Sequence, residues 1–299
     1  MSNLTRPSVI DPVPRAVDRT MRILFRPFDI QKWFALGFCA WLAYLGEGGS
    51  SNVGNRFGRD DFPGTLDRAL NWIRDHLVLI VVLTLVLFAL GILLTWVSSR
   101  GKFLFLDGVV NNRAAVVEPW ARFATLGNSL FGFRFVLAVI GFATFAGLAV
   151  LIVRDLLRVV GPIGFGDILA LGLWVVAFSP LLIVLLVIGL ILEDLVVPIM
   201  WLRQVSVLIA WREALAFVSA NLWIFVLYAM VKVLLAITIA LIACVATCVT
   251  CCVAALPYIG VVLLLPLYVF RRSYSLEFLA QFGPDYAALA PSPAGDLPR

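Results

Sequence analysis

The residues best placed to do chemistry in this 299-residue chain are charged side chains within long apolar runs. Lys232 lies near the middle of an apolar stretch that begins at Asn221, and Glu193 and Asp194 directly follow another, which ends at Leu192. A charge inside a bilayer is costly, so such residues usually face the interior of a helix bundle and pair there. These three predict an intramembrane polar site. It could be a substrate or ion pathway, a lipid headgroup site, or an ion pair that ties helices together. The structural alternatives are that Lys232 extends toward the membrane surface and that the two acids simply end a span at the headgroups.

Four cysteines form a second candidate cluster near the C-terminal end of the Asn221 stretch. Cys244, Cys248, Cys251 and Cys252 have the spacing i, i+4, i+7, i+8, so they share one face if the segment is helical. Thiols on one stripe cannot surround a zinc ion tetrahedrally. Small residues are favoured where membrane helices pack closely, so packing is the preferred interpretation. Lipidation, redox chemistry and a partial metal site stay open, and we expect no cofactor.

Known hydrolase motifs are absent or incomplete. His76, the single histidine, has neither a His-x-x-x-His partner nor a nucleophile motif nearby. Residues 164–167, Gly-Phe-Gly-Asp, match the motif of intramembrane aspartyl proteases. That chemistry needs a second carboxylate close by, and Glu193 lies about 40 Å of helix away from Asp167. Motifs for binding nucleotide phosphates are missing as well. We therefore expect a protein that is not an enzyme.

The composition indicates that lipid is the solvent of this chain. Hydrophobic residues make up 62% and charged residues only 14%, and the mean hydropathy is +1.02. Ordinary soluble domains carry about 25% charged residues. The net charge of +5 comes mostly from scattered arginines and not from a dense basic run, so nucleic-acid binding is not expected. Long apolar runs predict an all-α integral membrane protein.

Six apolar segments are assigned as membrane-spanning helices of a six-helix bundle. A span takes about 20 residues, so the short first segment, which Asp29 is expected to cap, spans only if it tilts or thins the bilayer. One helix over residues 221–270 would be about 75 Å long, so this stretch is divided before Pro257. Amphipathic segments within residues 98–130 and 195–218 are expected to lie along the inner surface. The expected spans are 29–46, 77–97, 131–153, 168–192, 221–247 and 257–272.

The distribution of basic residues predicts that both termini are cytoplasmic. Residues 1–27 form the N-terminal segment, residues 28–282 the membrane domain and residues 283–299 a disordered tail. Basic residues exceed acidic ones before the first span, and the inner loops of a six-span topology are arginine-rich. We therefore expect a multi-pass protein of the cell inner membrane. Membrane lipids are its expected partners, and a partner protein or a homo-oligomer stays open.

Several stretches resemble an uncharacterised bacterial family of multi-pass membrane proteins. They are residues 26–33 (RPFDIQKW), 46–49 (GEGG), 118–120 (EPW), 197–200 (VPIM), 256–260 (LPYIG) and 274–286 (YSLEFLAQFGPDY). That family is distantly similar to the membrane domain fused to some glycerophosphodiester phosphodiesterases. The resemblance implies a helical membrane domain. It does not imply phosphodiesterase activity, because the catalytic barrel is missing here.

The sequence leaves two main functional hypotheses and a third that is disfavoured, a membrane enzyme acting on lipid, for which Arg100, Arg113, Glu118 and Arg122 are the only candidate residues. The first is a non-enzymatic membrane protein, an accessory or scaffold protein that interacts with lipid or a partner. The alternative is a small transporter or channel that uses Lys232 with Glu193 and Asp194. A continuous polar cavity lined by these three residues would favour the alternative, and a tightly packed apolar bundle would exclude it.

Overall fold

The computed structural model describes residues 7–45, 76–113, 115–156, 165–249 and 257–288, and every regular element in those ranges is helical. This confirms the all-α class for the described part of the chain. The elements are α1 (Pro12–Phe25), α2 (Ile30–Ala43), α4 (Leu77–Asn111), α5 (Val117–Arg122), α6 (Ala124–Leu156), α7 (Phe165–Ile191), η1 (Leu192–Val196), α8 (Val197–Arg203), α9 (Val207–Ala220), α10 (Leu222–Val249), α11 (Pro257–Leu263), α12 (Leu265–Leu279), η3 (Ala280–Phe282) and η4 (Pro284–Tyr286).

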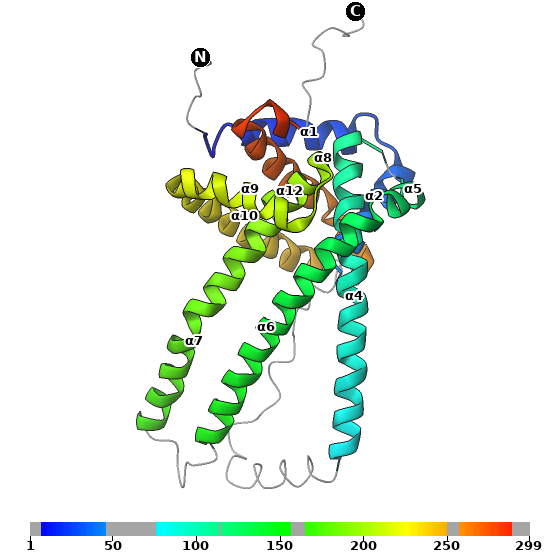
Figure 1. The fold of residues 1–299 in the computed structure, drawn as a ribbon. Coiled ribbons are helices and arrows are strands. Elements are labelled where there is room, and N and C mark those ends of the chain that lie inside the picture. Colours follow the sequence, from blue (N-terminus) through cyan, green and yellow to red (C-terminus); the bar gives the residue numbers. More distant parts are fainter. Residues whose placement is uncertain (1–6, 46–75, 114, 157–164, 250–256, 289–299) are drawn as a thin grey trace, which may run out of the picture.

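Three long helices extend from a compact head region (Figure 1). The head region comprises α1, α2, α5, η1, α8, α9, α10, α11, α12 and the part of α4 beyond Val97. Its core includes the run Phe103–Leu106, in which no side chain is more than 1% exposed. The sequence predicted that this run lies on the inner surface, after a span ending at residue 97. Instead α4 continues without a break to Asn111, so the run becomes the centre of the head region.

Four helical stretches in the described residues are long and apolar enough to cross a membrane. They are Leu85–Asn111, Ala124–Ile152, Gly172–Arg203 and Leu222–Val249. Between 6% and 22% of the residues in their most apolar windows are buried in the protein. Exposed apolar helices of this kind need lipid or other membrane helices around them, which is compatible with a membrane protein.

The predicted count of six spans is not confirmed. The first predicted span is α2, which has 14 residues and is about 21 Å long, shorter than a hydrocarbon core of about 30 Å. The last predicted span divides at Leu264 into α11 and α12. Pro266 cannot donate to the carbonyl of Val262, which instead accepts from Trp33 Nε1 at 3.1 Å. The break in the helix thus ties α11 to α2.

The two ends of the described chain meet in the head region. α1 packs along α12, and the hydroxyl of Tyr274 donates to the carbonyl of Val9 at 3.1 Å in a buried contact. α1 is amphipathic, and it buries a face that includes Ala16, Ile23 and Leu24. The predicted N-terminal segment therefore contributes a helix to the core of the head region.

Candidate functional site

Lys232 and Asp194, singled out from the sequence, form a buried ion pair in the head region. Lys232 Nζ lies 3.0 Å from Asp194 Oδ1, and both side chains are 4% exposed. Ser275 of α12 joins them, because its Oγ lies 3.1 Å from Lys232 Nζ and donates to Asp194 Oδ1 at 2.9 Å. The contact connects α10, η1 and α12, which are far apart in the sequence.

Glu193 lies next to this pair and binds two other cations. Its carboxylate is 3.4 Å from Lys102 Nζ of α4 and 3.3 Å from Arg271 Nη2 of α12. Its side chain is 16% exposed. We call Lys102, Glu193, Asp194, Lys232, Arg271, Arg272 and Ser275 the charge cluster. The structure brings the three predicted residues together, although Glu193 and Asp194 pair with different cations.

A π-helical turn presents both acids to the charge cluster. Consecutive residues of an α-helix point about 100° apart, and the wider η1 places Glu193 and Asp194 among partners from three other helices. Pro198 accounts for this turn. Its ring would clash with the carbonyl four residues earlier in a regular α-helix. The N–H of Val197 donates to Leu192 instead, five residues back.

The same proline leaves a backbone acceptor that Arg272 satisfies. In the π-helical register, residue 198 would donate to the carbonyl of Glu193, but Pro198 has no N–H. Arg272 Nη1 donates to that carbonyl at 2.7 Å, and Arg272 is only 3% exposed. An unpaired buried carbonyl would be costly, so this contact fixes α12 against η1.

Two tyrosine rings enclose the ammonium group of Lys232. Tyr228 and Tyr274 are stacked with centroids 5.6 Å apart, and the Lys232 nitrogen lies 5.6 Å and 5.8 Å from their centroids. Both rings are fully buried. The negative faces of the rings stabilise the cation where water is excluded. Lys232 is therefore held by a carboxylate, a hydroxyl and two aromatic rings.

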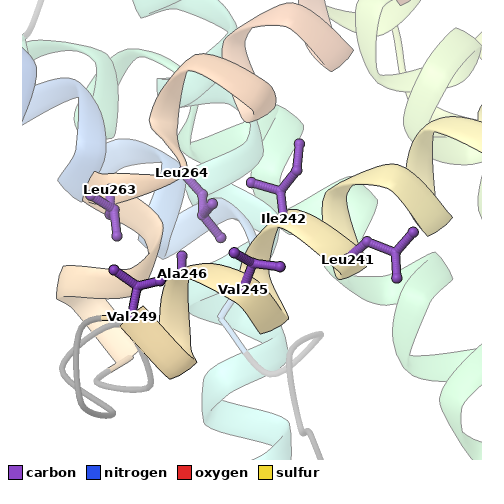
Figure 2. A pocket seen from close by; sticks show the side chains of 7 residues that line it. All are labelled: Leu241, Ile242, Val245, Ala246, Val249, Leu263 and Leu264. Carbon is purple, nitrogen blue, oxygen red and sulfur yellow. The ribbon is translucent and has the colours of Figure 1, made fainter.

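An apolar groove lies away from the charge cluster. A groove of about 550 Å³ between the end of α10 and the α11–α12 junction is lined by Leu241, Ile242, Val245, Ala246, Val249, Leu263 and Leu264 (Figure 2). None of these side chains carries a charge. The groove therefore does not supply the polar cavity that the transporter hypothesis asks for.

The cysteine cluster is only partly within the described residues. Cys244 and Cys248 are exposed, free thiols on α10, next to the positions that line the groove. Cys251 and Cys252 lie outside the described residues. The structure therefore does not test whether the four thiols gather.

Sequence reasoning missed four members of the charge cluster. Lys102 lies in a predicted inner loop and Arg271 and Arg272 lie at the cytoplasmic end of the last predicted span, and neither these three residues nor Ser275 was predicted to belong to a site. Two features of the sequence could have pointed to the charge cluster. Lys102 is one of only three lysines in the chain, and Pro198 follows Asp194 at the helix spacing of four. Ser275 is 81 residues from Asp194, a separation that sequence patterns do not connect.

One protein family matches nearly the whole chain. The sequence model of the family described as "Family of unknown function (DUF7544)" matches residues 8–283. No curated protein and no solved structure matches the chain.

Proposed function

We propose that this chain, which belongs to the family of unknown function DUF7544, is a non-enzymatic multi-pass protein of the inner membrane that serves as a scaffold. Its head region would hold α4, α6 and α7 at fixed positions in the bilayer. Their exposed apolar faces would then be available to lipid or to a partner protein. The positive-inside distribution of arginines supports a cytoplasmic head region and cytoplasmic termini.

The closed state of the charge cluster is the observation that carries this proposal. Glu193 and Asp194 are each paired with a cation from another helix at 3.4 Å or less. A transport site must release its ion or substrate, whereas these charges bind one another in a buried setting. Removing one partner of such a pair costs about 3–5 kcal/mol, because it leaves the other charge buried and unpaired. The cluster is thus suited to lock helices together.

The transporter or channel hypothesis retains one supporting observation. π-helical turns occur frequently at functional sites, and here the turn carries both acids. A transporter would use a rearrangement of η1 to exchange Lys232 for a transported cation beside Asp194. The two hypotheses predict different effects of removing Lys232. The scaffold predicts a loss of stability, and the transporter predicts a loss of ion flux.

The experiment is to substitute Lys232→Met and to measure stability and ion flux together. For the scaffold, we expect the unfolding temperature and the folded yield to fall, because Asp194 loses its buried partner. Arg212→Gln, which removes one exposed charge on α9, is the matched control and should leave both unchanged. Wild-type proteoliposomes containing a pH-sensitive dye should show no more proton flux than empty vesicles, with and without a sodium gradient.

A double variant separates the two hypotheses. Lys232→Met with Asp194→Leu removes both charges, so the scaffold predicts that it recovers part of the stability lost in Lys232→Met. A wild-type flux that disappears in a Lys232→Met protein of unchanged stability would contradict the scaffold and favour transport.

A further inference from the structure

Arg100 of α4 lies between two tryptophans at the edge of the head region. Its guanidinium carbon is 4.4 Å from the ring centroid of Trp96 and 5.4 Å from that of Trp120 on α5. The two indoles meet edge to face, with centroids 6.0 Å apart. Asn128 of α6 accepts from both Arg100 Nη2 at 3.1 Å and Trp96 Nε1 at 3.2 Å. We call Trp96, Arg100, Trp120 and Asn128 the Trp–Arg site.

The charge of Arg100 has no carboxylate partner among the described residues. Lys102, Arg113, Arg203, Lys232 and Arg271 each pair with an acid in the same part of the chain. Arg100 instead donates to the neutral Asn128, and its Nε is buried without a hydrogen-bond partner. A guanidinium has several N–H donors in a fork that suits phosphate. Most of this capacity is left unused.

The backbone of α6 at Gly127 leaves room for the Arg100 side chain. A Cβ atom at Gly127 would lie 2.6 Å from Arg100 Cγ and 3.3 Å from Arg100 Cα. Only glycine allows α4 and α6 to approach so closely here. The stem of Arg100 is therefore fixed by packing, and its position does not depend on an ion pair.

The Trp–Arg site lies where α4 changes from an exposed helix to a buried one. Leu93 is 53% exposed, while Phe103 is fully buried. Arg134 of α6 lies at the same level, where it donates to Ser98 and Ser99 of α4 at 3.1 Å and 3.2 Å. Tryptophan and arginine at the end of an apolar span are typical of the headgroup layer.

We propose that the Trp–Arg site binds the phosphate diester of an anionic membrane lipid. The phosphate would accept from the free donors of Arg100 at the edge of the head region, and the acyl chains would follow the exposed apolar face of α4. A lipid with net negative charge is required because the site supplies a cation and no carboxylate. The inference rests on the proposed embedding of α4 and α6 in a bilayer.

Native mass spectrometry of the detergent-purified full chain tests this site. The probes are phosphatidylglycerol, phosphatidylcholine and inorganic phosphate. We expect wild type to retain phosphatidylglycerol in preference to phosphatidylcholine, and Arg100→Gln to weaken that retention about tenfold, as the loss of one charge-assisted contact predicts. Arg122→Gln is the control, because Arg122 is an exposed arginine on α5 whose guanidinium carbon lies 5.4 Å from the centroid of the Phe123 ring and outside the Trp–Arg site.

A second variant keeps the test decisive if Arg100→Gln fails to fold. Asn128→Asp has the same shape and gives Arg100 an internal carboxylate, so it should fold and still lose phosphatidylglycerol. The proposal would be overturned if Arg100→Gln and Arg122→Gln weakened the retention of phosphatidylglycerol equally. It would also be overturned if the wild type retained phosphatidylglycerol and phosphatidylcholine equally. Displacement of the lipid by equimolar inorganic phosphate would show a free-phosphate site instead. Carbonate extraction tests the membrane embedding separately, because a chain released by carbonate overturns that premise whatever it binds.

Discussion

Each of the three lysines of this chain connects helices that are distant in the sequence. Lys32 Nζ donates to the carbonyl of Ile23 at 2.7 Å and to Asn112 Oδ1 at 2.6 Å. Lys102 and Lys232 reach Glu193 and Asp194 in the charge cluster. An ammonium group on a flexible stem can donate in three directions. At this scale the lysines act as cross-links, as Arg271 and Arg272 do between α12 and η1.

Glu277 of α12 is an ionisable residue whose burial opposes its charge. Burial raises its pKa, and the charges of Arg15 and Arg19 on α1 only partly offset this effect. A carboxyl with a higher pKa in the folded state stabilises the protein below its unfolded pKa, about 4.3. That contribution is lost as the pH rises through the folded pKa.

We therefore expect Glu277→Gln to raise the unfolding temperature slightly at pH 7.5, by about 1 °C after allowance for solvent screening. The difference should shrink as the pH falls below the unfolded pKa of about 4.3, because the Glu277 carboxyl then becomes protonated in both the folded and the unfolded wild type. Thermal unfolding followed across that pH range measures it. Glu118→Gln is the control, because it removes an exposed partner of Arg113 and should give no gain. A gain independent of pH would rule out the titration of Glu277 as its cause.

The crossing of α2 and α4 depends on direct backbone contact. A Cβ at Gly101 would lie 2.5 Å from the carbonyl carbon of Leu42 and 2.7 Å from the nitrogen of Ala43. Ser98 Oγ donates to the carbonyl of Ala43 at 2.8 Å next to this point. Because both groups belong to the backbone of α2, neither can move aside like a flexible side chain.

Gly101→Ala should accordingly destabilise the protein by about 1–3 kcal/mol or more, the usual cost of overfilling a packed core. The same substitution at Gly91 on α4, where nothing lies within 4 Å, should be neutral or stabilising by up to about 1 kcal/mol through helix propensity. Denaturant unfolding in detergent compares the two. Similar effects at both positions would contradict the close crossing.

The sequence predicted where helices form better than where they end. The long apolar runs correspond to α4, α6, α7 and α10, because a segment without polar groups fits lipid only as a helix. Asp29 caps α2 as expected, accepting from Gln31 N at 2.8 Å. The extension of α4 to Asn111 was missed because residues 98–111 gain burial from other helices, and composition alone assigns them to the surface.

In the charge cluster, single-sequence reasoning found the acids and Lys232 but not their pairing. A charged residue in an apolar run is visible in the sequence because it breaks the pattern. Its partner can be recognised only when it also interrupts an apolar run. Lys102 and Arg271 interrupt no such run, because each lies near the polar end of its segment. The π-helical turn follows from Pro198 only once the neighbouring helices are known.

At the scale of the whole molecule, the chain closes on itself. Ser8 N donates to Gln281 Oε1 at 2.6 Å, and Gln281 Nε2 donates back to the carbonyl of Ser8 at 2.8 Å. These two residues are 273 positions apart. The sequence predicted that both termini lie on one side of the membrane. It did not predict the direct contact between them, which depends on the packing of α1 against α12.

Cross-linking checks this closure in the membrane. In a variant without the five native cysteines, S8C and Q281C together should be joined rapidly by a short bismaleimide, giving a band of altered mobility. S8C alone and Q281C alone should give none at the monomer position. Modification of only one position by a membrane-impermeant maleimide, in vesicles of a single orientation, would contradict the shared side.

The charge cluster also has a consequence for the order of synthesis. Lys232 leaves the ribosome 38 residues after Asp194, and Ser275 leaves it 81 residues after Asp194. At a translation rate of about 5–20 residues per second, Asp194 waits about 4–16 s for its last partner. Until Lys232 emerges, about 2–8 s after Asp194, the two acids at the end of an apolar helix have only Lys102 available from the charge cluster. A ribosome that stops early therefore leaves a chain whose unpaired carboxylate distinguishes it from the finished protein.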